Sequence, residues 1–347
     1  MTTFDVRHSA PVPSVGRRTA DTVLVLRALG LGDALTGLPA LRGARRLYPD
    51  RFLTMAVGPE IGGWLKGLGL IDEVLPTDRL AELEWPPSGW IGVGGHVAID
   101  LHGRGPLSHR ILAATAPDEL IAFRCRRAGH LAGPRWQQEE HEVQRWCRLI
   151  RSAGGSCDAE DLRLPRSGDR TDSVVVHPGA ASASRRWPED RWGLLAGRIA
   201  RSGRRIIVTG GPGEVELCTR VVEIASAAGG AGAADMQVEA GTLDLPALTT
   251  VIGGSALLVS GDTGVAHLAT ALSTPSVLLF GPTAPQYWGP AIDSTRHTVL
   301  WHGSVDEPGN PHGDVIDPAL ASITASEVIE AVSDLLAVVM PEVPDSW

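Results

Sequence analysis

Lysine is almost absent from this chain. Of its 31 basic residues, Lys66 is the only lysine and all the others are arginine. A nucleotide-binding P-loop ends in Gly-Lys-Ser or Gly-Lys-Thr, whereas Lys66 lies in the stretch WLKGLG. A P-loop is therefore excluded.

Cysteine and the signatures of several enzyme classes are also scarce. The four cysteines form no close pair in the sequence and fit neither a zinc site nor a disulfide framework, so we expect reduced thiols at Cys125, Cys147, Cys157 and Cys218. There is no Gly-x-Ser-x-Gly, His-Glu-x-x-His, Cys-x-x-Cys or EF-hand spacing. These absences exclude hydrolase, zincin and calcium-binding interpretations.

Long apolar runs and an excess of positive charge are missing too. No run approaches the ~20 apolar residues that span a bilayer, and residues 1–21 lack the apolar core of a secretion signal. We therefore expect a cytoplasmic protein with a flexible N-terminal arm. The net charge of −9 argues against nucleic acid as a partner. A basic face with Arg42, Arg45 and Arg46 predicts at most peripheral contact with a membrane or an anionic acceptor, unless it is simply solvated.

Repeated strand, glycine-rich loop and helix patterns fill the rest of the chain. One block covers residues 22–160 and a second restarts at 172, separated by a polar linker around residues 158–172. Strands that alternate with helices predict parallel sheets, and two such blocks predict an α/β protein with two Rossmann-like, doubly wound domains. The second domain is expected over residues 172–318, and residues 319–347 are expected to form a C-terminal helix and tail.

Sequence signals also predict the extents of individual helices. Apolar residues recur near helical spacing from Leu35 to Leu47, and a longer helix is expected from Gln138 to Ala153, before two glycines. The C-terminal helix is expected to be capped by Thr324 or Ser326.

The first glycine-rich loop follows the strand that ends at Leu26. Gly30, Gly32 and Asp33 supply only part of a dinucleotide fingerprint. Asp33 is interpreted either as a helix N-cap or as a proton acceptor that faces a cleft, with Arg27 as its partner.

The second loop follows the strand that ends at His177. Ser182, Ser184, Arg185 and Arg186 precede a helix, and hydroxyls and guanidinium groups at a helix N-terminus are typical of a phosphate site. The alternative is a solvated turn with surface arginines.

The third loop, Gly261-Asp262-Thr263-Gly264, opens another helix. Its glycines let the backbone approach a ligand, and the Thr263 hydroxyl and nearby N–H groups can bind diphosphate oxygens. Asp262 is expected to cap the helix, orient the loop or accept hydrogen bonds from ligand hydroxyls. His267, taken alone, is more often packed than functional.

Four stretches together resemble the glycosyltransferase family 9 heptosyltransferases of the ADP-heptose:lipopolysaccharide type. They are VLVLRALGLGDALTGLPALRGARRLYPD, VVVHPGAASASRRWPEDRWGLLA, VTGGPGE and LLVSGDTGVAHLATALSTPSVLLFGPTAPQYWGP. The resemblance runs from about residue 22 to 336. It implies a GT-B fold, with the acceptor on the N-terminal domain and the nucleotide sugar on the C-terminal domain.

The resemblance also implies roles for individual residues. Asp33 would be the general base, and the acceptor-side loop would comprise Arg27, Gly30 and Gly32. Arg185 stands where the family has a phosphate-binding lysine. The expected donor-binding residues are Ser184, Arg185, Leu243, Asp262, Thr263, Gly264 and His267.

The implied reaction is an inverting, metal-independent transfer of a sugar, heptose from ADP-heptose as the first expectation, to an acceptor hydroxyl. No cofactor is expected, and the acceptor is a saccharide or small molecule, either lipid-linked as in relatives or free. The alternatives are another nucleotide-sugar enzyme on the same frame, such as an epimerase, an NAD-linked oxidoreductase, or a binding module without catalysis.

Overall fold

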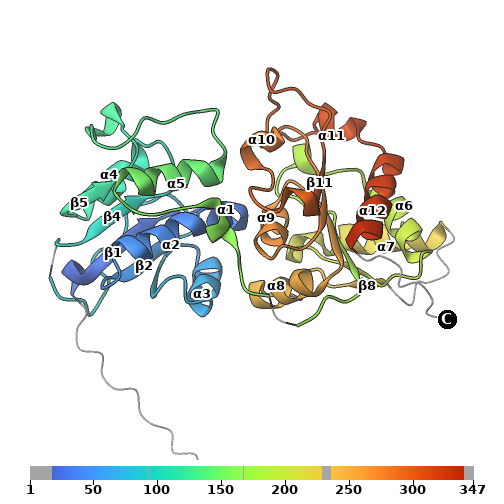
Figure 1. Cartoon of the computed structure of the whole chain (residues 1–347), viewed down its shortest axis with the longest axis horizontal. Coiled ribbons are helices and arrows are strands. Elements are labelled where there is room, and N and C mark those ends of the chain that lie inside the picture. The colour runs from blue at the N-terminus through green and yellow to red at the C-terminus, as the bar shows by residue number, and fades with distance from the viewer. Residues whose placement is uncertain (1–17, 93, 167, 229–235, 340–347) are drawn as a thin grey trace, which may run out of the picture.

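The computed structural model describes residues 18–92, 94–166, 168–228 and 236–339. These residues form two sheets of parallel strands, each flanked by helices, and the two halves lie side by side (Figure 1). The predicted α/β architecture of two doubly wound units is confirmed. Residues 1–17 of the predicted N-terminal arm, which was expected over residues 1–21, and the predicted C-terminal tail lie outside the described residues. The end of that arm is not a free segment, because Thr19–Asp21 forms a short 3-10 helix and Thr19 is buried.

The N-terminal lobe, residues 18–166, is built on a five-stranded sheet in the order β3-β2-β1-β4-β5. The strands are β1 Thr22–Leu26, β2 Phe52–Val57, β3 Glu73–Pro76, β4 Val97–Asp100 and β5 Glu119–Ile121. The α-helices are α1 Leu31–Thr36, α2 Leu38–Leu47, α3 Pro59–Gly67, α4 Leu107–Ala114 and α5 Glu142–Ser152. Every residue of β1 is buried, as expected for a strand covered on both faces.

The C-terminal lobe, residues 168–339, is built on a six-stranded sheet in the order β11-β10-β9-β6-β7-β8. The strands are β6 Val174–His177, β7 Ile206–Val208, β8 Met236–Val238, β9 Leu257–Gly261, β10 Ser276–Leu279 and β11 His297–Leu300. The α-helices are α6 Glu189–Ala200, α7 Val215–Ala227, α8 Leu245–Gly254, α9 Gly264–Ala271, α10 Pro285–Trp288, α11 Pro318–Ser322 and α12 Ala325–Val339.

The strand orders explain where the glycine-rich loops lie. In the C-terminal sheet the order reverses between β6 and β9, and the second and third loops follow these two neighbouring strands. In the N-terminal sheet it reverses at β1, which the first loop follows. Ligands of doubly wound sheets bind beyond the carboxyl ends of strands at such switch points. The three loops are therefore where the fold is expected to hold a ligand.

Two predicted helices differ from the structure. The stretch from Leu35 to Leu47 is divided at Gly37, and a new helix begins at Leu38. Pro39 lies in the first turn of that helix, where it has no backbone N–H to donate to the preceding helix. The helix expected from Gln138 starts only at Glu142. The preceding residues are held outside it because the carbonyl oxygens of Gln137, Gln138 and Glu140 accept hydrogen bonds from the Arg145 guanidinium.

The last helix, α12, is capped as expected. The Thr324 backbone N–H donates to Glu327 Oε2 at 2.7 Å, and the Glu327 N–H donates to Thr324 Oγ1 at 3.3 Å. The helix packs against α6 and β10 and buries Val328 and Val332 in the core of the C-terminal lobe.

The three arginines of the predicted basic face of α2 are all paired within the chain, while the Arg45 and Arg46 side chains stay partly exposed. Arg45 Nη2 lies 2.5 Å from Asp72 Oδ2, Arg46 forms an ion pair with Asp161, and Arg42 Nη1 donates to the Arg163 carbonyl at 2.7 Å. The contacts of Arg46 and Arg42 tie α2 to the segment that connects the two lobes, and that of Arg45 ties it to the loop before β3. Among the described residues, no helix is long and apolar enough to cross a bilayer.

The two lobes share one hydrophobic core cluster. It runs from β1 and Leu35 of α1 into Val265 and Leu268 of α9. Figure 1 shows α1 and α9 facing each other where the two halves meet. A Cβ atom added at Gly264 would lie 2.9 Å from Leu31 Cβ and 3.0 Å from Gly32 N, so the starts of α1 and α9 are in close contact. This contact brings the first and third loops together.

Candidate active site

A cavity of about 550 Å³ lies where the loops after β1, β6 and β9 meet. It falls in the size range of small-molecule and cofactor sites. Eight of the residues expected from the sequence line it: Gly30, Gly32, Asp33, Arg185, Asp262, Thr263, Gly264 and His267. Both lobes therefore contribute the expected side chains to one cavity.

Asp33 comes from the N-terminal lobe. It is the third residue of α1, whose N-cap is Gly30, so the interpretation of Asp33 as the N-cap is wrong. Its side chain is 31% exposed and reaches the cavity. Burial raises the pKa of Asp33 above its ordinary value, and the Glu142 carboxylate adds to this, while Arg27, His102 and Arg185 oppose it. Such a carboxylate is a better proton acceptor than an exposed one.

Arg27 lies behind Asp33 and does not reach the cavity. The residue is fully buried, and its Nη2 atom is 3.6 Å from Asp33 Oδ1. Nη1 donates to the Leu101 carbonyl and Nη2 to Thr36 Oγ1, at 2.9 Å for the latter. The expected partnership with Asp33 is confirmed. The Arg27 side chain turns into the core and does not line the cavity, unlike Gly30 and Gly32 of the loop that follows it.

The second loop brings Arg185 into the cavity from the C-terminal lobe. Arg185 Nη1 donates to the Asp262 carbonyl at 3.1 Å, which fixes the guanidinium against the third loop. Its Nε atom is buried and has no hydrogen-bond partner among the described residues. Arg186 instead donates to the Ala180 carbonyl at 2.8 Å and braces the loop.

Ser184 and Leu243, also expected to bind the donor, do not line the cavity. Ser184 is only 2% exposed, and its N–H donates to the Gly313 carbonyl at 3.1 Å, so the residue is covered by the loop around Gly313. Leu243 is half-buried between β8 and α8. Neither residue faces this cavity in the arrangement of lobes seen here.

The third loop contributes Asp262 and Thr263. Thr263, rather than Asp262, is the N-cap residue of α9, and its buried hydroxyl has no hydrogen-bond partner among the described residues. Burial raises the pKa of Asp262 to about 6, although Arg185 and a hydrogen bond with Thr283 act in the opposite direction. Asp262 therefore orients the loop through Thr283 and does not cap the helix.

His267 is a neutral group of the cavity wall. Burial lowers its pKa to about 4, and the nearby His141, Arg27 and Arg185 contribute to this. Its ring lies edge-on to Trp288, with 6.0 Å between the centroids. Since the ring is uncharged near pH 7, it can donate one hydrogen bond and accept another. His267 therefore both packs against Trp288 and lines the cavity, and its role in donor binding stays a prediction.

The sequence analysis missed several residues of the cavity. They are His177, Glu214, Thr283, Trp288 and His312. Glu214 Oε2 accepts a hydrogen bond from Gly211 N at 2.7 Å, and Gly179 has no side chain where one would overlap this carboxylate. The glycines of VTGGPGE, after β7, were the sequence signal that could have pointed to Glu214. Trp288 had no comparable glycine-rich signal, because it lies on α10, after the third loop and β10.

Two residues that line this cavity carry buried donors without partners. Among the described residues, Arg185 Nε and Thr263 Oγ1 have no hydrogen-bond partner, and the cavity wall also includes Gly264 and Val265 at the start of α9, where backbone N–H groups have no partner inside the helix. Buried donors in folded proteins are nearly always satisfied, and exceptions call for a ligand or water. Their chemistry suits an anion such as a phosphate. Within the described residues, no group of three or more His, Cys, Asp or Glu is arranged to hold a metal ion.

Comparison with known proteins identifies the family of this chain. Residues 134–307 match the family model described as glycosyltransferase family 9 (heptosyltransferase). Lipopolysaccharide heptosyltransferase 1 of Pseudomonas aeruginosa is 35% identical over 311 residues, which cover 77% of this chain and 80% of that protein. Its counterpart from Escherichia coli K12 is 24% identical over 299 residues, 76% of this chain and 88% of that protein.

Solved structures agree on the fold. The E. coli ADP-heptose lps heptosyltransferase II has a TM-score of 0.70 at 19% identity, over 91% of this chain and 98% of that one. E. coli heptosyltransferase WaaC with ADP has a TM-score of 0.66 at 21% identity, over 90% and 99%. The chain thus has the GT-B fold of these enzymes, and it belongs to glycosyltransferase family 9, the heptosyltransferase family.

Proposed function

We propose that this chain transfers a heptosyl group from ADP-heptose to a hydroxyl of a saccharide acceptor, with inversion at the anomeric carbon and without a metal ion. One observation supports the proposal most: Asp33 of one lobe and Arg185 and Thr263 of the other, residue types suited to a base and to phosphate binding, line the same cavity. The relatives named as lipopolysaccharide heptosyltransferases and the neighbour solved with ADP support this choice of acceptor class and donor.

The donor's diphosphate would lie on the C-terminal lobe. Arg185, the Thr263 hydroxyl and the N–H groups at the start of α9 would stabilise the negative charge that grows as the nucleoside diphosphate leaves. Arginine offers a planar pair of donors where the family resemblance implies lysine, so it can bind two phosphate oxygens at once. These fixed positive groups take the role that a divalent cation has in other transferases.

The hydroxyls of the donor's sugars would meet the carboxylates at the carboxyl ends of β7 and β9. Glu214 and Asp262 line the cavity and can each accept hydrogen bonds from hydroxyl groups. Trp288 also lines the cavity, and its ring would help to exclude water from the reacting carbon when the donor is bound.

Asp33 would act as the general base. Asp33 lines the cavity from the N-terminal lobe and Arg185 lines it from the C-terminal lobe, so Asp33 would take the proton of a hydroxyl that attacks from the face away from the leaving group. Attack from that face inverts the anomeric configuration. One cavity would hold the base, the acceptor and the donor together, in the orientation that the transfer needs.

The test uses the full chain with ADP-heptose, UDP-sugars and GDP-sugars, each offered with lipid-linked core saccharides and with free sugars. We expect ADP release that depends on an acceptor and continues in EDTA, read by mass spectrometry, and a product of inverted configuration, read by NMR. Donor conversion without an acceptor would instead indicate an epimerase or a hydrolase, and a product of retained configuration would also contradict the proposal.

Asp33→Asn isolates the base. We expect transfer to fall by about 100-fold or more, while the Kd for ADP stays nearly unchanged, because the acid–base step alone is lost. Asp334→Asn, on the exposed face of α12, is the matched control and should leave turnover unchanged. Wild-type turnover by the Asp33 variant would remove this residue from its role.

A further inference from the structure

A second carboxylate lies behind the cavity, on the other side of Arg27 from Asp33. Glu142 is the first residue of α5 and is buried, and its Oε1 atom lies 3.5 Å from Arg27 Nη2. The same nitrogen is 3.6 Å from Asp33 Oδ1. One buried cation therefore serves two carboxylates that come from segments far apart in the sequence.

The rest of the Arg27 guanidinium is occupied by neutral groups. Nε donates to the Asp33 carbonyl, Nη1 to the Leu101 carbonyl, and Nη2 to Thr36 Oγ1 at 2.9 Å. The guanidinium carbon also lies 4.7 Å from the centre of the Trp146 ring. Arg27 is thus held in place by its surroundings and does not offer Asp33 the two parallel hydrogen bonds of a bidentate pair.

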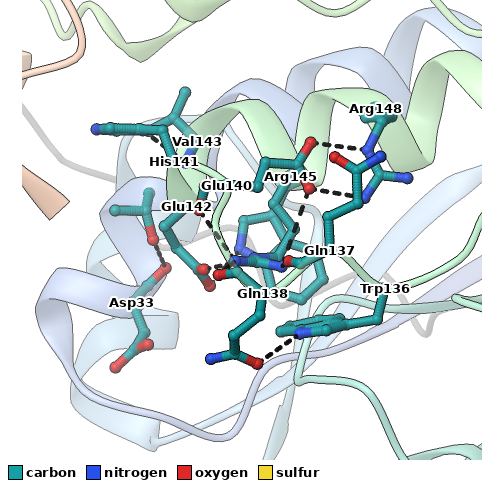
Figure 2. Close-up of polar contacts among 12 residues, drawn as sticks. Asp33, Trp136, Gln137, Gln138, Glu140, His141, Glu142, Val143, Arg145 and Arg148 are labelled. Carbon is teal, nitrogen blue, oxygen red and sulfur yellow. Dashed lines mark hydrogen bonds and ion pairs between the residues drawn. The ribbon is translucent and has the colours of Figure 1, made fainter. Parts of the chain in front are cut away.

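Glu142 is fixed just as firmly. Its Oε2 accepts from Arg145 Nε at 2.9 Å, and its Oε1 accepts from Trp146 Nε1 at 2.8 Å. Figure 2 shows Glu142 between Asp33 and Arg145, while the neighbouring Glu140 points to Arg148 on the far side. A carboxylate held in this way cannot swing away from Arg27, and its charge is a permanent part of the environment of Asp33.

We propose that Glu142 is a positioning residue for the transfer: by sharing Arg27 with Asp33, it keeps the guanidinium from clamping the base and leaves the Asp33 carboxylate free to accept a proton. This proposal rests on the role of Asp33 in the proposed function. No contact between Glu142 and substrate is involved, since Glu142 does not line the cavity.

The charges around Asp33 fit this role. Arg27 from the end of β1, His102 after β4 and Arg185 from the other lobe all lower the pKa of Asp33. Burial and Glu142 raise it, and Asp33 in turn raises the pKa of Asp262. Without Glu142, the three positively acting groups would hold the Asp33 carboxylate more strongly in its ionised form. The base would then be weaker, because a carboxylate of lower pKa takes up a proton less readily.

The deciding experiment measures the titration of Asp33 directly, in the full chain. Aspartate labelled with ¹³C at the carboxyl carbon is incorporated, and the Asp33 signal is assigned by its loss in Asp33→Asn. In Glu142→Gln, which keeps the shape and removes the charge, we expect the Asp33 midpoint about one pH unit lower than in the wild type. The acidic limb of the kcat/KM profile should move to lower pH by the same amount, while plateau kcat falls.

Glu140→Gln is the matched control. It removes a carboxylate two residues away that pairs with Arg148 at 2.6 Å, and it should leave the Asp33 midpoint in place. An unmoved or raised midpoint in Glu142→Gln, or an equal shift in the control, would overturn the proposal. If Glu142→Gln does not fold, Glu142→Asp takes its place, because it withdraws the carboxylate by one methylene. We expect it to lower the Asp33 midpoint by less than about one pH unit. An Asp33 midpoint unchanged in Glu142→Asp would also overturn the proposal.

The titration needs no substrate, so the two proposals fail separately. A lowered midpoint in a chain that transfers no sugar would uphold the link between Glu142 and Asp33 and refute the proposed function. Sugar transfer by the wild type, together with an unmoved Asp33 midpoint in Glu142→Gln, would support the proposed function and refute the link between Glu142 and Asp33.

Discussion

At the scale of single residues, the account depends most on Arg185. It stands where the family resemblance implies lysine, it is anchored to the Asp262 carbonyl at 3.1 Å, and its Nε has no partner among the described residues. Arg185→Met should weaken ADP binding by about 10- to 100-fold, because a charge-assisted hydrogen bond to phosphate is lost. Calorimetry measures this, with Arg198→Met on the exposed face of α6 as control. Equal affinities for ADP in both variants would place the diphosphate elsewhere.

Asp262 gives a prediction about stability and pH. Its pKa is raised from 3.8 to about 6, so between these values the folded chain holds a proton that the unfolded chain has released. This contribution to stability is present at low pH and is lost as the pH rises through 6. Above pH 6 the ionised, buried carboxylate therefore destabilises the fold, an effect of order 1–3 kcal/mol.

Asp262→Asn should remove this penalty. We expect the variant to be more stable than the wild type in urea at pH 7.5, with the difference shrinking toward pH 4, while its affinity for the donor falls. Greater stability of the wild type at pH 7.5 would show that the ionised carboxylate is well compensated in the folded chain.

At the scale of elements, the contact between the starts of α1 and α9 positions the two halves of the cavity. Gly264→Ala should force these helices apart, because the new Cβ would lie 2.9 Å from Leu31 Cβ. We expect a loss of about 1–3 kcal/mol of stability from overpacking, together with lower kcat/KM, since Asp33 and Arg185 move apart.

Gly63 in α3 is the control for this substitution. A Cβ there meets nothing within 4 Å, so Gly63→Ala should stabilise the chain by about 0.5–1 kcal/mol through helix propensity alone. Chemical denaturation measures both variants. A gain in stability for Gly264→Ala as well would mean that the lobes adjust freely at this point.

The start of α5 joins the lobes in a second place. His141 Nδ1 accepts from Val143 N at 3.2 Å as the helix cap, and Nε2 donates to the Gly289 carbonyl at 3.0 Å. Both bonds require the neutral ring, and burial lowers the pKa of His141 accordingly. His141→Asn should keep the cap but lose the reach to Gly289, so we expect nearly unchanged thermal stability and a reduced kcat. A fall in stability with unchanged kcat would contradict this division of roles.

At the scale of the whole molecule, the fold could be predicted because each strand, glycine-rich loop and helix has a local signature. The cavity residues Asp33, Arg185 and Thr263 could be predicted because the loops that carry them lie at strand ends where a doubly wound sheet binds ligands.

Contacts between distant segments could not be predicted in this way. The arginines of α2 turn out to pair with Asp72, Asp161 and nearby carbonyls, and Glu142 reaches Arg27 only through the packing of α5 beside α1. Trp288 likewise enters the cavity from α10. No local sequence pattern predicts these partners, because they depend on how the lobes and helices pack.

The central claim is that one nucleotide sugar bridges the two lobes, with its diphosphate on the C-terminal loops and its reacting carbon toward the N-terminal base. The most direct measurement is a crystal structure of Asp33→Asn with ADP-heptose. We predict diphosphate oxygens within hydrogen-bond distance of Arg185 and Thr263, and an anomeric carbon that faces residue 33. A diphosphate bound away from these two residues, or a residue 33 that points away from the sugar, would contradict the account.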